Sequence, residues 1–469
     1  MGKLRFLFAL WMAKLSIPAL KITRHNGTDF PGSLAVKLCP DFLRYVGKPK
    51  TIVAVTGTNG KTTTSNMIGD ILESDGRRII SNRAGSNMLS GVATALLQSC
   101  DLLGRCRRCD AAVLEIDERS SPYIYRHLTP DLLVVTNLYR DSIKRNGHSA
   151  FIYDKIAQCL PARTTLLLNG NDAISGLLGE GTNERIFFSV ERTERSADTC
   201  PNIACDIMAC PRCGHMLHFD YYHFHHIGAP HCPRCGFAMP ESRYTACDVD
   251  FAAETFTLRQ KDGEDLRLPF PTGDLFNVFN VTAAAAACRH LGVSGQVVTQ
   301  AISRLTAKTG RFEAAHAGAL DIVTMLSKNQ NPISSSQSLA YLAHVPGRKD
   351  VVLLLTDSKD AIHGHEDISW LYDTDFDILK DDSVGKVFLG GTRCYDLALR
   401  LLLGGVPEEK LLLYPDYAAL EAALPEQVTD SGTVAIFFEL YAMPIAQKLR
   451  QVLEERFGGE KEVAKALKN

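Results

Sequence analysis

The stretch that decides the fold is Thr56-Gly57-Thr58-Asn59-Gly60-Lys61-Thr62-Thr63-Thr64, which joins the apolar run 52–55 to residues that favour a helix. A strand that runs into two glycines and then a Lys-Thr pair at a helix start offers backbone N–H groups, an ammonium and a hydroxyl to a polyphosphate. The strict pattern asks for glycine where this chain has Val55, so only its second half is matched. The alternative is a glycine-rich turn that binds nothing. We predict that this loop binds a nucleoside triphosphate.

Other apolar runs of the same region also end in polar residues. Residues 113–118 and 131–137 are short runs that finish in acids or amides, and 165–168 is followed by Asn169. In doubly wound sheets ligands lie at the carboxyl ends of the strands, so we expect these ends to meet at the phosphate loop. Glu115 is then a candidate Mg²⁺ ligand, and a solvated strand end is the other interpretation.

The composition is that of a soluble globular protein. The chain has 469 residues, which favours two to three domains, with 45% hydrophobic and 22% charged residues. A net charge of −2 gives no case for nucleic acid as a partner.

The 14 cysteines, in a sequence with no clear export signal, predict reduced thiols or metal ligands rather than disulfides. The same knuckle, Cys-Pro-Arg-Cys-Gly, begins at Cys210 and again at Cys232, with 18 residues between the two cysteine pairs. This spacing predicts a structural Zn²⁺ bound by four thiolates, a site with no open position for chemistry. The four ligands are Cys210, Cys213, Cys232 and Cys235. We expect the histidines between the two knuckles, including His223, His225 and His226, to be solvated loop residues.

The first 46 residues read as an amphipathic helix followed by an irregular connector. Its basic members are Lys3, Arg5, Lys14, Lys21 and Arg24, and its apolar run is far too short to span a bilayer. The helix either packs on the domain behind it or rests on an anionic membrane surface.

The remaining sequence divides into two α/β domains. We predict a central nucleotide-binding domain over residues 47–312, interrupted by a zinc ribbon at about 199–242. A second composition shift follows residue 312, and new strands are predicted at 320–326, 350–356, 387–389 and 434–438. Residues 313–469 are a comfortable size for one C-terminal α/β domain.

Several motifs together resemble a known family. The loop at 56–62, Asn277 and Asn280 before an alanine-rich helix, and Gly310-Arg311 are similar to elements of the Mur ligases and folylpolyglutamate synthetases. The inserted ribbon, with residues 136–141 and 367–370, narrows the resemblance to the MurT family, the Mur ligase-like subunits of lipid II isoglutaminyl synthases. The resemblance covers nearly the whole chain. It implies a Mur ligase-like central domain and a C-terminal Mur ligase-like domain.

The resemblance also implies an activity. A MurT-type subunit uses ATP and Mg²⁺ to activate the α-carboxylate of D-glutamate in the lipid II stem peptide as an acyl phosphate. Ammonia from a separate GatD-type glutaminase, its partner in a heterodimer, then gives D-isoglutamine for peptidoglycan synthesis. Such a protein works in the cytoplasm, at the inner face of the plasma membrane.

Residue roles carry over by motif position. Lys61 and Thr62 would contact phosphates and Mg²⁺ with Glu115, Asn280 would face adenine, and Arg311 would reach the nucleotide from the hinge. An aspartate of the C-terminal domain would complete the partner's Cys-His pair, with Asp367 the first choice and Asp357 the second; a helix-capping loop carboxylate is the plain alternative for either. The candidate nucleotide-binding residues are Gly57, Thr58, Asn59, Gly60, Lys61, Thr62, Thr63, Glu115, Asn280 and Arg311; the candidate catalytic residues are Lys61, Asp367 and Asp357.

Two other functions are open at this point. An amino-acid-adding Mur or folylpolyglutamate ligase shares the chemistry, but muropeptide ligases carry a nucleotide-sugar domain before the phosphate loop, and about 50 residues leave no room for it. A non-catalytic nucleotide-binding scaffold for a partner is favoured by the segment between Asp357 and Asp367, which is longer than is usual for the family.

Overall fold

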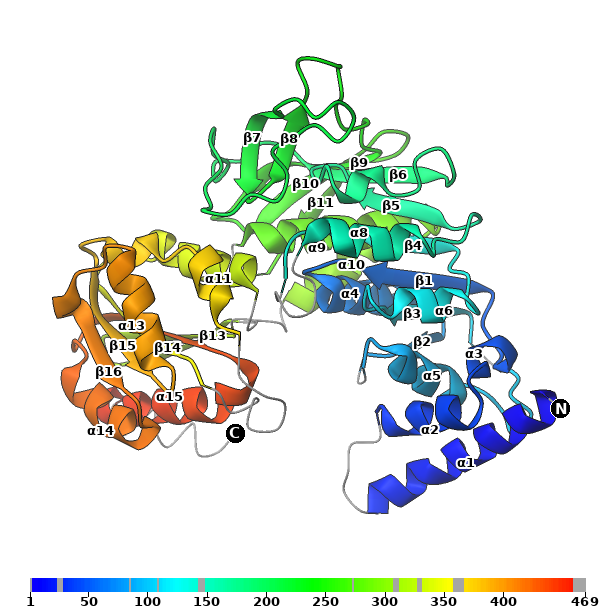
Figure 1. The fold of residues 1–469 in the computed structure, drawn as a ribbon, viewed down its shortest axis with the longest axis horizontal. Helices are drawn as coiled ribbons and strands as arrows, with labels where there is room; N and C mark the ends of the chain where they lie inside the picture. Colours follow the sequence, from blue (N-terminus) through cyan, green and yellow to red (C-terminus); the bar gives the residue numbers. More distant parts are fainter. Residues whose placement is uncertain are drawn as a thin grey trace. The chain divides into compact units, whose positions relative to one another are not determined.

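A computed structural model describes residues 2–22, 28–83, 86–107, 109–141, 148–271, 274–306, 312–326, 331–356 and 367–458. The chain forms two compact units (Figure 1). The first comprises Met1–Tyr139, His148–Cys200 and Asp206–Thr309, and the second comprises Arg140–Gly147, Pro201–Cys205 and Gly310–Asn469.

The first unit is built on a nine-stranded sheet in the order β11-β10-β9-β6-β5-β4-β1-β3-β2. Strands β9, β6, β5, β4, β1, β3 and β2 run parallel to one another, and β10 and β11 add an antiparallel edge next to β9. Their bounds are β1 Thr51–Thr56, β2 Ile79–Ser81, β3 Ala111–Glu115, β4 Leu132–Val135, β5 Thr165–Asn169, β6 Arg185–Val190, β9 Tyr244–Asp250, β10 Thr255–Gln260 and β11 Leu266–Pro269. Because Val55 pairs with Glu115 and Thr56 with Val135, the polar carboxyl ends of β1, β3 and β4 lie at one edge, as predicted.

Helices cover both faces of this sheet. On one face, α4 (Lys61–Ser74), α9 (Leu275–His290) and α10 (Gly295–Thr306) pack together. On the other face, a single core joins the strands to α1 and to five shorter helices. These are α2 Phe30–Leu38, α3 Phe42–Tyr45, α5 Leu89–Gln98, α6 Ser121–Tyr125 and α8 Ser149–Ala157, and a 3₁₀ turn, η1, spans Ser175–Leu177.

Helix α1 (Gly2–Ile22) is apolar on two faces, which differs from the amphipathic pattern that we predicted. One face is buried against the domain through Phe6, Ala9, Leu10 and Ala13. Two of its basic residues clamp it there: Arg5 Nε donates to Leu38 O at 2.6 Å and Lys14 Nζ to Cys100 O at 2.7 Å. The outward side carries exposed Leu4, Phe8, Trp11, Met12 and Leu15. No described helix is both long and apolar enough to cross a membrane.

The inserted segment contains a two-stranded ribbon, β7 (His218–Phe224) and β8 (Ile227–His231), between two cysteine knuckles. Phe224 is buried and packs against Phe276 and Phe279 of α9, at ring-centroid distances of 4.3 and 5.8 Å. Because of this contact, the ribbon is part of the first unit's core and not an isolated lobe.

The second unit has a six-stranded sheet in the order β12-β13-β17-β14-β15-β16, parallel except for β12. The strands are β12 Phe312–Ala317, β13 Leu320–Leu326, β14 Lys349–Leu354, β15 Val384–Gly390, β16 Leu411–Tyr414 and β17 Gly432–Phe438. Strands β13, β14, β15 and β17 confirm the four that we predicted.

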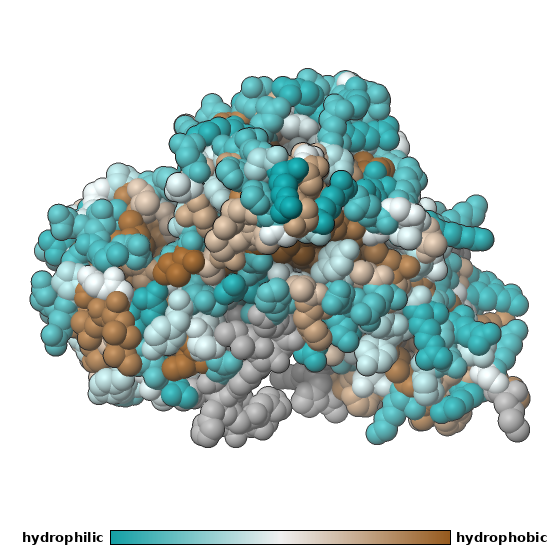
Figure 2. All heavy atoms as spheres, turned by 45° about the horizontal axis from the view of Figure 1, so that its top comes forward, coloured by the Kyte–Doolittle hydropathy of each residue, from teal (hydrophilic) through white to brown (hydrophobic). Residues whose placement is uncertain are grey.

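One face of the second sheet is covered by α11 (Pro332–Ala340), α13 (Cys394–Leu403) and 3₁₀ turns, and the other by α14 (Tyr417–Gln427) and α15 (Met443–Phe457). The 3₁₀ turns of this unit are η2 Tyr341–His344, η3 Ser369–Asp373, η4 Asp377–Lys380, η5 Glu408–Lys410 and η6 Leu440–Ala442. The face of the molecule in Figure 2 is mainly hydrophilic, with hydrophobic residues in separate patches. Exposed large apolar side chains of this unit gather on α13, at Tyr395, Leu399, Leu402 and Leu403.

Candidate functional site

The loop between β1 and α4 has a backbone that only glycine fits at two positions. Gly57 has a φ of +128° and Gly60 a φ of +81°, both disfavoured for other residues. A Cβ on Gly57 would lie 2.2 Å from Thr136 Oγ1, and one on Gly60 would lie 2.2 Å from Asn280 Oδ1. The two glycines therefore let the chain turn tightly against β4 and α9.

The loop is braced by the two residues that follow β4. Asn137 accepts a hydrogen bond from Thr58 N through its carbonyl and one from Asn59 N through its side chain, both at 2.9 Å. Thr136 Oγ1 donates to Asn59 O at 2.6 Å. These two backbone N–H groups are thus engaged within the protein, so an anion here would be met chiefly by the first turn of α4.

The start of α4 suits a phosphate. Its N-cap is Gly60, which has no side chain to bond to the first-turn N–H groups. Those N–H groups have no acceptor within the helix, and the helix dipole adds positive potential at the same point. Thr62 is exposed and Thr63 half-buried in this turn. The residues present therefore fit a bound polyphosphate.

Lys61 lies in the same turn, but its partner is an acid that our sequence analysis did not select. Its ammonium donates to Gly57 O, to Thr58 O at 3.3 Å and to Glu118 Oε1 at 2.9 Å. The side chains of Lys61 and Glu118 are 10% and 3% exposed. Glu118 is the last residue of the acidic segment that begins at Glu115, and its place in that segment is the only feature of the sequence that could have indicated it.

Glu115 and Asn280 are both held near the loop. Glu115 is half-buried at the end of β3, and its Oε1 accepts a hydrogen bond from Asn87 Nδ2 at 2.9 Å. Asn280 is buried on α9 with its Oδ1 3.5 Å from Thr64 Oγ1. Arg311, proposed to act from the hinge, lies outside the described residues.

The candidate carboxylates of the second unit are only partly described. Asp367 Oδ1 accepts hydrogen bonds from the backbone N–H of Ser369, at 3.0 Å, and from its hydroxyl. This is a local turn contact just before η3, whose N-cap is Ile368, and the role of Asp367 toward a partner stays a prediction. Asp357 lies outside the described residues.

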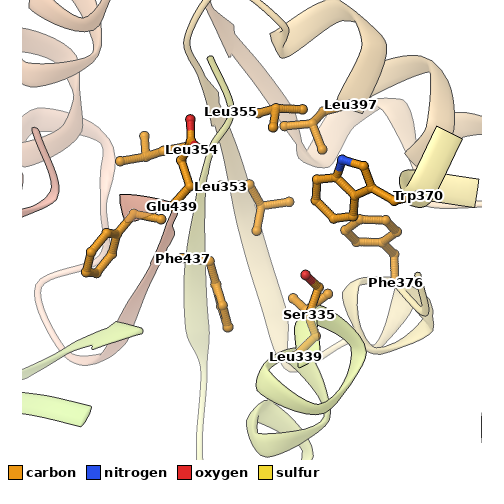
Figure 3. A pocket seen from close by; sticks show the side chains of 11 residues that line it. Ser335, Leu339, Leu353, Leu354, Leu355, Trp370, Phe376, Leu397, Phe437 and Glu439 are labelled. Carbon is orange, nitrogen blue, oxygen red and sulfur yellow. The ribbon is translucent and has the colours of Figure 1, made fainter. Parts of the chain in front are cut away.

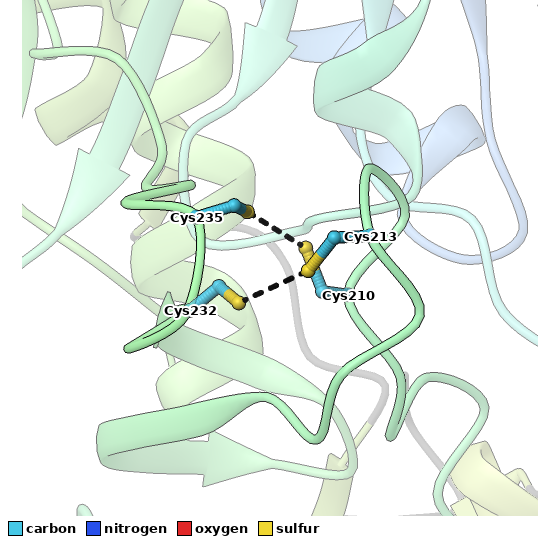
Figure 4. A group of neighbouring side chains, drawn as sticks. All are labelled: Cys210, Cys213, Cys232 and Cys235. Carbon is cyan, nitrogen blue, oxygen red and sulfur yellow. Dashed lines mark hydrogen bonds between the residues drawn. The ribbon is translucent and has the colours of Figure 1, made fainter.

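The four cysteines of the two knuckles form one cluster (Figure 4). Cys210 Sγ lies 3.6 Å from Cys235 Sγ, and Cys213 Sγ lies 3.6 Å from Cys232 Sγ. A disulfide would need about 2.05 Å, whereas thiolates bound to zinc at about 2.3 Å lie about 3.8 Å apart. Their sulfur atoms all lie within 4.8 Å of one another, so the four residues fit a tetrahedral zinc ion. All 14 cysteines are free, as predicted.

The prediction for the ribbon histidines is wrong at three positions. His223 is 5% exposed, and His225 and His226 are 0% exposed. The turn between β7 and β8 folds back onto the sheet, which the sequence did not indicate, and His226 Nε2 lies 3.1 Å from Asp172 Oδ1.

The second unit also has an apolar pocket that our sequence analysis missed (Figure 3). Trp370 and Phe376 lie next to each other on one side of it, and Leu353 of β14 lines it as well. The buried indole N–H of Trp370 has no hydrogen-bond partner within the described structure.

Comparisons with known proteins bear on both units. The family model "Mur ligase middle domain" matches residues 55–194, and "MurT ligase C-terminal" matches residues 326–443. The MurT subunit of the lipid II isoglutaminyl synthase of Staphylococcus aureus strain COL is 32% identical over 85% of this chain and 88% of its own length. This chain belongs to the MurT family. The MurT subunit from Streptococcus pneumoniae is 30% identical, over 82% of this chain and 84% of its own.

Solved structures support the same fold for this MurT-family chain. A pseudomurein peptide ligase type C from Methanothermus fervidus has a TM-score of 0.65 at 20% identity, covering 89% of this chain and 80% of its own. MurF ligase from Thermotoga maritima, solved in complex with ADP, has a TM-score of 0.56 at 17% identity, covering 92% and 84%. The predicted Mur ligase-like α/β fold and the family are thereby confirmed.

Proposed function

We propose that this chain is the ATP-dependent ligase subunit that amidates the D-glutamate α-carboxylate of the lipid II stem peptide to D-isoglutamine in peptidoglycan synthesis. ATP phosphorylates the carboxylate, and ammonia displaces phosphate from the acyl phosphate. The relatives named as subunits of a lipid II isoglutaminyl synthase support this reaction and a partner subunit. We identify that partner as a GatD-type glutaminase, which hydrolyses glutamine to supply the ammonia.

The observation that carries the proposal is the shape of the phosphate loop. Gly57 and Gly60 let the backbone turn tightly, the first turn of α4 presents its N–H groups, and the Lys61 ammonium donates hydrogen bonds to two carbonyls of the loop. These groups would hold the phosphates of ATP and offset the charge that develops during phosphoryl transfer. Mg²⁺, held by Thr62 with Glu115, would supply a further positive charge to the transferred group.

Lys61 has a resting position that suits this role. In the described structure its charge is neutralised by Glu118, at 2.9 Å, so the lysine does not leave an unpaired cation in a buried site. Phosphate oxygens compete with Glu118 for the same ammonium when the nucleotide binds. Glu118 thus positions Lys61 before binding.

The test is amidation of lipid II by the chain together with its glutaminase, run in parallel with glutamine and with ammonium chloride as the nitrogen source. Lys61→Met should abolish amidation with either source because the ligase step itself fails. The matched control is Lys261→Met, which removes an exposed lysine paired with Glu241 at 2.6 Å and should leave the rate unchanged. Full activity of Lys61→Met would refute the ligase function and favour a scaffold.

Asp367 gives a different pattern if it completes the partner's Cys-His pair. Asp367→Asn should lower the glutamine-dependent rate and spare the ammonium-dependent rate. Asp377→Asn, which removes an exposed acid that pairs only with Lys380 within the described part of the chain, serves as the control. Equal loss with both nitrogen sources would show that Asp367 supports the fold and not the partner.

The chain is further proposed to work in the cytoplasm at the inner face of the plasma membrane. The outer side of α1 supports this, since Leu4, Phe8 and Leu15 are 75%, 54% and 64% exposed on a helix whose other face is already buried. Apolar side chains on a surface helix partition into the headgroup region of a bilayer. Replacing these three residues by serine should reduce co-sedimentation with vesicles containing anionic lipid; unchanged co-sedimentation would contradict the membrane contact.

A further inference from the structure

A second group of potential metal ligands, separate from the four cysteines, lies at the turn of the ribbon. His225 and His226 form the turn between β7 and β8, and Asp206 precedes the first knuckle. One ligand atom from each of the three residues lies within 4.8 Å of the other two. The side chains of His225 and His226 are 0% exposed and that of Asp206 is 1% exposed.

The backbone at this turn is unusual for a histidine. His225 has a φ of +48°, in the left-handed region that residues other than glycine seldom occupy. Such a conformation persists where the surrounding structure holds it, and it is concentrated at functional sites. Here it accompanies two consecutive imidazoles buried on the same side of the turn, with their Nδ1 atoms 2.7 Å apart.

His226 has the outer contact expected of a metal ligand. Its Nε2 lies 3.1 Å from Asp172 Oδ1, and Asp172 is itself held by hydrogen bonds from Leu138 N, at 2.7 Å, and Ile174 N, at 2.9 Å. A histidine that binds a metal commonly donates its other ring N–H to such a fixed carboxylate. The contact assigns the proton to Nε2 and leaves the Nδ1 lone pair of His226 directed at His225.

The distance between His225 and Asp206 is longer than a hydrogen bond between the two side chains would be. His225 Nε2 and Asp206 Oδ2 are 3.8 Å apart, whereas a charge-assisted hydrogen bond would draw them to about 2.7–2.9 Å. Two ligand atoms that share one metal ion at about 2.0–2.2 Å each lie between 3 and 4 Å from one another. A separation of 3.8 Å therefore suits a shared ion better than a shared proton.

We propose that Asp206, His225 and His226 form a second metal site, for a divalent ion of the zinc class, separate from the four cysteines. Two imidazole nitrogens and one carboxylate oxygen are a donor set that zinc accepts, and they leave a fourth position for another ligand. Both imidazoles bind as neutral rings, so the ion replaces the hydrogen bond between the two Nδ1 atoms and the Nδ1 proton stays on His225.

The site is connected to the phosphate loop through Tyr139. The ring of Tyr139 lies 5.8 Å from that of His225 and 6.3 Å from that of His226. The backbone of Tyr139 exchanges two hydrogen bonds with the Thr58 hydroxyl, at 3.0 and 3.1 Å. The two imidazoles therefore pack against the residue whose backbone supports the phosphate loop.

The test is the number of metal ions bound per full-length chain, measured by elemental analysis after equilibration with excess Zn²⁺ and gel filtration. The wild-type chain should hold two, and the double variant His225→Gln/His226→Gln should hold one. His223→Gln is the matched control, because His223 is buried on the same ribbon but bonds to Val190 O and Ser196 Oγ, and it should keep two. One metal in the wild-type chain, unchanged in the double variant, would overturn the proposal.

Cobalt spectroscopy keeps the test decisive if a variant folds poorly. Co²⁺ bound to thiolates has a sulfur-to-metal charge-transfer band that Co²⁺ bound to nitrogen and oxygen lacks. Cys210→Ser/Cys213→Ser should still bind one Co²⁺, without that band, and the histidine double variant should bind one Co²⁺ with the full band. Absence of Co²⁺ from a folded Cys210→Ser/Cys213→Ser chain would overturn the second site. These measurements involve no nucleotide, so they stand apart from the proposed ligase activity.

Discussion

The pair formed by Lys61 and Glu118 predicts a large and specific loss of stability when only one partner is removed. Both side chains are nearly buried, at 10% and 3% exposed, and their charged atoms are 2.9 Å apart. Lys61→Met removes the ammonium and leaves a buried carboxylate without its cation. Breaking a buried pair in this way costs about 3–5 kcal/mol. For a unit of this size the melting temperature should fall by about 5–8 °C.

The assay is thermal unfolding of the nucleotide-free chain, carried out as a double-mutant cycle. Glu118→Gln alone should also destabilise, because the Lys61 ammonium is then buried without a counter-charge. Lys61→Met/Glu118→Gln should regain at least half of the loss, since no unpaired charge remains.

An exposed ion pair with a shorter distance is the control that separates the effect of burial from the effect of distance. Lys261 and Glu241 approach to 2.6 Å, closer than Lys61 and Glu118, but they are 55% and 73% exposed. Lys261→Met should change stability by no more than about 1 kcal/mol, because water screens the pair. If Lys61→Met behaves like Lys261→Met, or if the two substitutions at the buried pair simply add, burial does not govern this interaction and our reasoning is refuted.

Three further outcomes follow from single features. Gly60→Ala should abolish nucleotide binding in a fluorescence titration, because its methyl group would meet Asn280. Gly181→Ala, at a φ of +74° with open space around it, is the control and should bind normally; normal binding by Gly60→Ala would refute the role of this contact. Alkylation by iodoacetamide, followed by peptide mass spectrometry, should leave exposed Cys235 unmodified until a chelator is added. Cys288, whose thiol pKa is raised by burial, should stay unmodified until the chain unfolds. Asp350→Ala leaves two half-buried backbone N–H groups without the carboxylate they reach at 2.8 and 3.2 Å, and should cost about 2 kcal/mol in denaturant unfolding.

The sequence was informative where a local pattern dictates local geometry. The glycines of the phosphate loop, the two cysteine knuckles and the β-branched strands each specify a conformation within a few residues, and the structure has them at the predicted places. The family itself followed from the combination of such motifs.

The features that the sequence did not indicate depend on long-range packing. Glu118 and Glu115 look alike in one acidic run, and only the path of the chain after β3 brings Glu118 to Lys61. The partner of His226, Asp172, lies 54 positions away in the sequence, so the burial of His226 depends on a contact that its neighbours do not indicate. Helix α1 is apolar on two faces. Its Arg5 and Lys14 bond to the backbone carbonyls of Leu38 and Cys100, partners that the sequence of the helix does not indicate.

The ribbon also has a consequence for the order in which the first unit assembles. It lies on the connection between β6 and β9, which are parallel neighbours in the sheet, so the position that usually belongs to a crossover helix is taken by roughly 50 residues of inserted chain. Closing a loop of that length costs about 3–4 kcal/mol of chain entropy. A ribbon folded around a metal ion would bring the ends of this loop together and so favour the pairing of β9 with the sheet, followed by β10, β11 and the helix that carries Asn280. Metal binding at the four cysteines would thereby speed the assembly of the nucleotide site.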